Sequence, residues 1–379
     1  MNLAQVEILI IAVLTSASCA LIGSFLILRK MAMMSDAISH TILLGIVVAF
    51  FITQDLSSPL LIIGATLTGL ATVFLVEMLQ KTKLVSEDAS IGTIFPFLFS
   101  IGIILISLYA GNIHLDIDSV LLGELAFAPF DRLVIRGLDL GAKSIYVMGV
   151  IFLLDLIYIV LFYKELKIVT FDSALATAIG ISPIIVHYSL MTLVSVTTVG
   201  AFNAVGAILV VALMIVPPST AYFWVEDLKK MIIWSTIFGA LSAIIGLLIA
   251  FRLDISIAGS MSVMSGVIFL IVFIFSPKKG LLTILKRRKR QKYEFAELSL
   301  LMHLLNHQEI EYEEIELKKP TIVEHLRWEE QFLNEIIERL SKYKYISIED
   351  DLLKINDNGI EYIRNNSILK ESENIQLCK

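Results

Sequence analysis

The sequence predicts an all-α polytopic membrane bundle of about eight to ten transmembrane helices, followed by a small α+β domain outside the membrane. The composition predicts the first part: 57% of the 379 residues are hydrophobic, 17% are charged, and the mean hydropathy is +0.82. This is too apolar for a soluble globular protein of the same length. The charge distribution predicts the second part, because residues 1–285 contain 14 Lys or Arg and 17 Asp or Glu, whereas the much shorter stretch 286–379 contains 16 and 19.

We therefore expect a transmembrane domain over residues 1–280, a basic juxtamembrane linker over 281–292 and a cytoplasmic domain over 293–379. The linker has six Lys or Arg residues in the seven positions from Lys286 to Lys292. Such a run can bind anionic lipid or nucleic acid, and an anchor on membrane lipid headgroups is the simpler interpretation.

Nine apolar segments, each close to the length that crosses a bilayer, fill the first domain. They lie near residues 6–28, 33–53, 59–79, 91–110, 145–162, 185–202, 205–223, 231–251 and 257–276. Basic residues occur at every second break between them, and the positive-inside rule places those breaks and the C-terminus in the cytoplasm. The stretch 120–143 does not fit, because Arg132, Arg136 and Lys143 fall on the expected outer side together with the helix breaker Pro129. We expect a re-entrant turn or an interfacial helix there.

The second apolar segment contains a carboxylate and an imidazole four residues apart, Asp36 and His40. This spacing puts both on one face of a helix, and ionisable residues inside a membrane span are costly enough to be candidates for function. Oxygen and imidazole nitrogen together suit divalent first-row metals such as manganese, iron and zinc, and the lack of a thiolate argues against a copper(I) site. The spacing alone leaves an alternative open, in which the two side chains bond to each other or to nearby backbone and hold helices together.

Four stretches of the sequence resemble the manganese/zinc/iron class of ATP-binding-cassette permeases. They are Gly23–His40, Glu87–Gly92, Phe171–Ile181 and Ala204–Pro217, in the order that is typical of the family. The resemblance covers residues 1 to about 277. It implies a multi-pass protein of the bacterial plasma (inner) membrane that imports divalent manganese, zinc or iron as substrate, with no permanently bound cofactor. It also implies that Asp36 and His40 belong to the metal path or gate.

The same resemblance implies three protein partners. They are a cytoplasmic ATP-binding subunit, an extracytoplasmic metal-binding protein and a second permease subunit in a homodimer or heterodimer. The chain has no G-x-x-x-x-G-K-[ST] phosphate loop, so we expect a transport subunit that does not itself hydrolyse ATP. The sequence departs from the family at Leu44, which precedes Gly45 where a proline is usual, and the second helix is therefore expected to be straighter.

Two predicted cytoplasmic loops are candidates for docking the ATP-binding subunit, 164–182 and 217–230. Comparison with related importers favours the second as the coupling segment. Both could instead be solvated connectors. The candidate coupling residues are Pro217, Pro218, Ser219, Asp227, Asp172 and Gly180.

Two further sets of polar residues in the first domain have open interpretations. The outer loop with His114, Asp116, Asp118 and Glu124 could receive metal ions or dock the binding protein, and a solvated acidic loop explains it equally well. His187 has no carboxylate at helical spacing. We therefore expect an interhelical hydrogen-bonding role for it in preference to metal ligation.

The last domain has a winged-helix pattern. Residues 295–305, 321–328 and 332–340 predict helices, 345–348 and 352–355 predict short strands, and a final helix follows Asn358-Gly359. This order resembles the winged-helix domain of metal-dependent repressors. However, residues 293–379 have 10 basic against 19 acidic residues, and the helix in the recognition position carries four glutamates, Glu329, Glu330, Glu335 and Glu338.

An acidic recognition helix would repel DNA phosphates. We therefore expect this domain to sense metal or contact the ATP-binding subunit, and not to bind nucleic acid. His303, His307 and His325 with nearby glutamates could form a regulatory metal site, or they could simply be solvated.

Two other functions are compatible with parts of the sequence. A membrane-anchored metal-responsive transcriptional regulator would use the winged helix on an operator, which the acidic charge opposes. A secondary carrier would transport without an ATP-binding partner, and co-purification of such a partner would exclude it.

Overall fold

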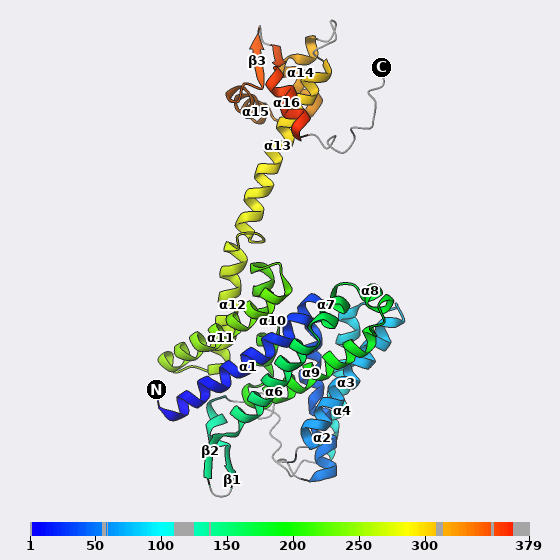
Figure 1. Cartoon of the computed structure of the whole chain (residues 1–379), viewed down its shortest axis with the longest axis vertical. Helices are drawn as coiled ribbons and strands as arrows, with labels where there is room; N and C mark the ends of the chain where they lie inside the picture. Colours follow the sequence, from blue (N-terminus) through cyan, green and yellow to red (C-terminus); the bar gives the residue numbers. More distant parts are fainter. Residues whose placement is uncertain are drawn as a thin grey trace. The chain divides into compact units, whose positions relative to one another are not determined.

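The computed structural model describes residues 2–54, 58, 60–109, 125–135, 138–307, 314–349 and 352–366. The chain divides into two compact units, Met1–Leu281 and Leu282–Lys379 (Figure 1). The residues expected to form a basic linker are helical, because they belong to α13, Leu281–His307.

The first unit is a helical bundle. Its described residues contain nine helices that are long and apolar enough to cross a membrane, which confirms the predicted polytopic all-α class. These helices are α1 (Leu3–Leu28), α2 (Ala32–Thr53), α3 (Leu60–Lys81), α4 (Glu87–Tyr109), α6 (Lys143–Leu161), α9 (Pro183–Val205), α10 (Ala207–Trp224), α11 (Leu228–Leu253) and α12 (Ile257–Phe275). Two short helices, α7 (Tyr163–Phe171) and α8 (Ser173–Ala178), join α6 to α9.

Helix α1 is the most deeply buried span of the first unit. It packs against α6, α9, α10 and α11 (Figure 1). Gly23 in α1 approaches α10 so closely that a Cβ atom there would lie 2.0 Å from the carbonyl oxygen of Met214. The hydrophobic effect does not drive helices together within lipid. Close van der Waals contact through small residues such as Gly23 therefore supplies the packing energy.

Helices α2 and α3 cross through a pair of glycines. A Cβ atom on Gly45 would lie 2.4 Å from the carbonyl oxygen of Gly64, and one on Gly64 would lie 2.7 Å from that of Gly45. Thr41 lies one helical turn before Gly45 on α2, and its hydroxyl accepts a hydrogen bond of 2.8 Å from the Thr72 hydroxyl of α3. The glycine contact and this hydrogen bond fix how α2 lies on α3, and α2 carries the candidate metal residues.

The stretch 120–143 is neither a re-entrant turn nor an interfacial helix in its described part. It contains a short 3-10 helix, η1 (Leu125–Phe130), and an antiparallel hairpin of β1 (Arg132–Ile135) and β2 (Leu138–Ala142). Arg132 pairs with Asp139 across the hairpin and with the largely buried Glu7 of α1, 3.5 Å away. The backbone N–H of Gly141 and the Arg132 guanidinium hold the pKa of the Asp139 carboxyl below its usual value. Arg132, one of the three cations that contradicted the charge rule, is therefore neutralised within the protein.

The second unit has the predicted order of elements. Its elements are the C-terminal part of α13, η2 (Glu314–Leu317), α14 (Lys319–Leu326), α15 (Glu330–Lys342), β3 (Ile346–Glu349), β4 (Leu352–Ile355) and α16 (Asp357–Asn366). Strands β3 and β4 pair antiparallel, and Lys318 adds an isolated bridge to Leu352. Leu300 of α13, Ile322 of α14, Ile336 of α15 and Leu353 of β4 are fully buried and belong to one apolar core. Its membership of the winged-helix class stays a prediction.

The glycine crossing of α2 and α3 gives the first testable prediction. Gly45→Leu should destabilise the protein by about 1–3 kcal/mol, because the side chain would be forced into the backbone of α3. Thermal unfolding in detergent micelles measures the effect. The matched control is Gly266→Leu in α12, where an added Cβ meets nothing within 4 Å. Equal losses in the two variants would contradict the close crossing.

Candidate metal site

Asp36 and His40 lie one turn apart on α2, as their spacing predicts. His40 Nε2 is 3.6 Å from Asp36 Oδ1, which is close but longer than a hydrogen bond, and about a third of each side chain is exposed. The hydroxyls of Ser35 and Ser39, on the buried side of the helix, instead donate to backbone carbonyls of α2. The structure therefore separates a buried serine face of α2 from a partly open face that carries the carboxylate and the imidazole.

Two aromatic rings of α4 hold the His40 ring in place. Phe95 stacks on it with 5.4 Å between ring centroids, and Phe99 meets it edge-on at 5.8 Å. These contacts fix the plane of the imidazole without using either ring nitrogen. A carboxylate oxygen and an imidazole nitrogen remain available together, which is the donor combination that suits a divalent transition metal.

The open face of α2 continues in both directions from the pair. Met33, Val48 and Ile52 are 50%, 45% and 77% exposed, and they share the helical spacing of Asp36 and His40. Two protein donors are too few for any common metal coordination, so a metal ion bound by Asp36 and His40 would need further ligands.

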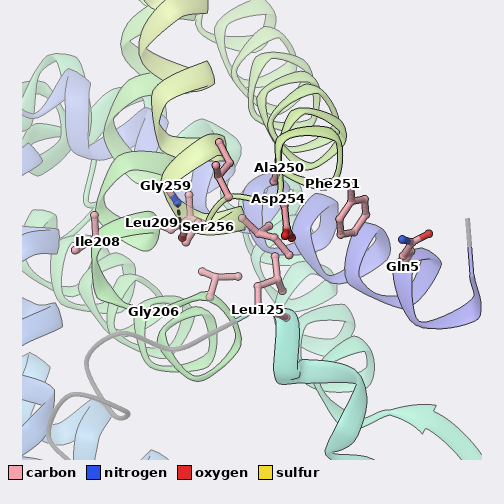
Figure 2. Close-up of a pocket in the computed structure, with 15 residues that line it drawn as sticks. Gln5, Leu125, Gly206, Ile208, Leu209, Ala250, Phe251, Asp254, Ser256 and Gly259 are labelled. Atoms are coloured by element: carbon pink, nitrogen blue, oxygen red, sulfur yellow. Dashed lines mark hydrogen bonds between the residues drawn. The ribbon is translucent and has the colours of Figure 1, made fainter.

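The pocket in Figure 2 is a different feature of the first unit. It has a volume of about 600 Å³ and lies between the beginnings of α1, α10 and α12 and the end of α11. Among the described residues that line it, Asp254 is the one ionisable side chain, and neither Asp36 nor His40 lines it. A single carboxylate among mostly apolar groups is a poor metal site, so the donor chemistry favours α2 over this pocket.

A charged network joins α1, α3 and α9 at the end of the bundle opposite that pocket. His187 Nε2 contacts Glu77 Oε1, and the Tyr188 hydroxyl donates to Glu77 Oε2 at 2.9 Å. Arg29 lies 3.3 Å from His187 Nδ1 and donates to Thr170 of α7. His187 thus has the interhelical role that was expected of it. Its carboxylate partner was missed because Glu77 is distant in sequence.

Sequence reasoning also missed Asp155, a fully buried carboxyl in the middle of α6. The Thr197 hydroxyl of α9 donates to its two oxygens, at 2.9 and 3.1 Å. An aspartate within an otherwise apolar run was the signal that could have identified it. The contact satisfies the carboxyl inside the protein, so the described residues assign Asp155 a packing role between α6 and α9.

The structure changes the extent of one candidate coupling loop. Pro217 and Pro218 are buried within α10, and Ser219 is helical with them, so these three residues do not lie in a loop. The prediction of a loop over 217–230 was therefore wrong in its first part, because the α10 helix continues through both prolines to Trp224 and a helix bundle tolerates prolines within its spans. Only a short connector with Asp227, whose side chain accepts from the backbone N–H of Lys230, remains between α10 and α11.

The other coupling candidates lie at the two ends of α8. The Asp172 carboxylate caps its N-terminus by accepting from the backbone N–H of Leu175 at 2.9 Å. Gly180 follows its C-terminus with a φ of +85°, a conformation that favours glycine. The outer-mouth candidates His114, Asp116, Asp118 and Glu124 lie outside the described residues.

Comparison with known proteins shows the family of the chain. Residues 3–276 match the ABC 3 transport family. The chain belongs to this family. The resemblance inferred from the four motifs is therefore confirmed, and the chain is a membrane-spanning transport component and not an enzyme.

Several members of the ABC 3 transport family are similar over most of the chain. The manganese transport system membrane protein MntD of Bacillus subtilis (strain 168) is 47% identical, covering 72% of this chain and 92% of that protein. The zinc transport system membrane protein TroD of Treponema pallidum (strain Nichols) is 42% identical, covering 85% and 88%. Among solved structures, PsaBC from Streptococcus pneumoniae in complex with Fab superposes with a TM-score of 0.63 at 30% identity, covering 75% and 96%.

The buried Asp155–Thr197 contact gives a second prediction. Thr197→Val should destabilise the protein by about 1–3 kcal/mol, because it leaves a buried carboxyl without its donor. Thr192→Val on the same helix is the matched control, since that hydroxyl only donates to a carbonyl of its own helix. Thermal unfolding of both variants decides the matter, and an unchanged midpoint for Thr197→Val would refute the packing role.

Proposed function

We propose that this chain is the permease subunit of an importer for divalent manganese, zinc or iron, powered by ATP hydrolysis on a separate subunit. The observation that carries the proposal is the Asp36–His40 pair, whose oxygen and nitrogen donors lie on an open face of α2 and are not closed on each other. The relatives named for manganese and zinc transport support the same class of substrate. The metal is cargo here, and the proposal includes no permanently bound cofactor.

The basic residues indicate the orientation of the bundle. Arg29-Lys30 at the end of α1, Lys81 and Lys83 after α3, and Lys278-Lys279 after α12 mark the proposed cytoplasmic side of a bacterial plasma membrane. Helix α2 begins at this side, so Asp36 and His40 lie about 6 and 12 Å along it at 1.5 Å per residue. The pair would thus act near the inner end of the metal path. The C-terminal unit would be cytoplasmic.

A second permease subunit would complete the site. The open face of α2 is apolar around the pair, as a face covered by another helix bundle would be. Related by a two-fold axis, two copies would bring two carboxylates and two imidazoles together. The second subunit would be either another copy of this chain or a related chain.

The ATP-binding subunit would dock on α8. Leu175 of α8, Ile179 directly after it and Phe171 at the end of α7 are 50%, 54% and 63% exposed. On the cytoplasmic side such exposed apolar side chains need a protein partner. The Arg29–Thr170 contact would connect movement at α7 and α8 to α1. Delivery by an extracytoplasmic metal-binding protein would occur at the opposite end of the bundle.

Removal of either metal donor should abolish transport. Asp36→Ala and His40→Ala should each lower uptake of radioactive manganese or zinc at least about tenfold. Replacing a residue that only supports a metal ligand already costs about tenfold or more, so loss of a ligand itself should cost at least as much. Uptake is measured in membrane vesicles that contain the complete transporter, with each variant normalised to its abundance. Glu294→Gln, which removes an exposed carboxylate of α13 outside the first unit, is the control. Undiminished uptake in both donor variants would reject the role.

The docking surface on α8 can be tested separately from the metal site. Leu175→Glu should reduce co-purification of the ATP-binding subunit about tenfold or more, because a charge would enter the centre of an apolar contact. Thr177→Glu places the same charge on another side of α8 and should have little effect. Loss of the subunit only when Asp227 is replaced would instead assign docking to the α10–α11 connector.

A further inference from the structure

The second unit brings three metal-ligating side chains together from three different elements. His303 comes from α13, Glu316 from η2 and His325 from α14. One ligand atom from each residue lies within 4.8 Å of the other two. Sequence reasoning named the histidines as a possible site but could not choose the carboxylate.

The contacts within this cluster place atoms that can ligate a metal close to one another. Glu316 Oε2 is shielded from solvent and has no hydrogen-bond partner among the described residues, yet His325 Nδ1 lies 2.8 Å away. His303 Nε2 lies 3.0 Å from the backbone carbonyl oxygen of Glu316, which orients its ring beside the same residue. A carboxylate oxygen and an imidazole nitrogen are thus held close together, and both are atoms that ligate divalent metal ions.

The cluster is open to solvent on one side. The Glu316 side chain is 25% exposed and that of His325 is 48% exposed, so solvent reaches the cluster from one side. Three protein ligands with an open direction for water are a common arrangement for divalent zinc and related ions. Two imidazoles and one carboxylate are ligands of intermediate softness. They suit zinc, iron or manganese and disfavour calcium and copper(I).

We propose that His303, Glu316 and His325 bind one divalent first-row transition metal ion in the C-terminal unit. The site is separate from the Asp36–His40 pair, which belongs to the other unit. Bound metal ties η2 and α14 to α13, the helix that begins at Leu281 where the first unit ends. A regulatory use of this site by imported metal rests on the proposed import function, whereas binding itself does not.

The test uses the purified full-length chain carrying Asp36→Ala and His40→Ala, so that the membrane site contributes no signal. Cobalt(II) serves as a spectroscopic probe through its visible absorption, and zinc competition then measures the affinity for zinc. We expect one equivalent of cobalt to bind. Adding Glu316→Gln or His325→Gln should weaken this binding at least about tenfold.

Glu324→Gln is the matched control, because it removes an exposed carboxylate next to His325 on the same helix and should leave binding unchanged. Circular dichroism of each variant checks that the fold is retained. Absence of cobalt binding in the parent, or equal losses in Glu316→Gln and Glu324→Gln, would overturn the proposal. Failure of the import function would show as normal uptake by the Asp36 and His40 variants, which leaves this titration unaffected.

Discussion

The constraint on which the rest of this structure depends is that a polar group inside hydrocarbon must find its partner within protein. Asp155 finds Thr197, and Glu77 finds His187 and Tyr188. Both arrangements join helices and give each carboxylate a partner from a neighbouring helix. Asp36 and His40 differ, because 3.6 Å separates their nearest atoms and a third of each side chain is uncovered. This difference separates packing residues from residues that remain free for a ligand.

The packing of α2 keeps these two side chains in position. Asp36 and His40 can contribute to a metal site only if they stay in place while the remaining ligands come from elsewhere. The glycine contact with α3 fixes the helix, and Phe95 and Phe99 fix the His40 ring without occupying its nitrogens. The C-terminal cluster of His303, Glu316 and His325 follows a related logic outside the membrane, where three elements of one unit supply three ligands.

The sequence predicts what depends on local spacing and average polarity. Nine spans follow from apolar length, and the proximity of Asp36 and His40 follows from one helical turn. Contacts between distant segments were not predictable: Tyr188 is 111 residues from Glu77, and only the folded bundle shows that they meet. Pro217 and Pro218 were misplaced because local preference against proline in helices yields to packing inside a bundle. The Arg132–Glu7 pair was also not predictable, because it joins segments that are far apart in sequence.

The central claim is that a divalent ion passes between the Asp36 carboxylate and the His40 imidazole. The most direct measurement is an experimental structure of the assembled permease pair in lipid, with manganese present and located by its anomalous scattering. Our account predicts an ion within about 2.0–2.3 Å of an Asp36 oxygen and a His40 nitrogen. A structure in which both side chains face hydrocarbon, or are closed in a hydrogen bond with each other while manganese binds elsewhere, would contradict it.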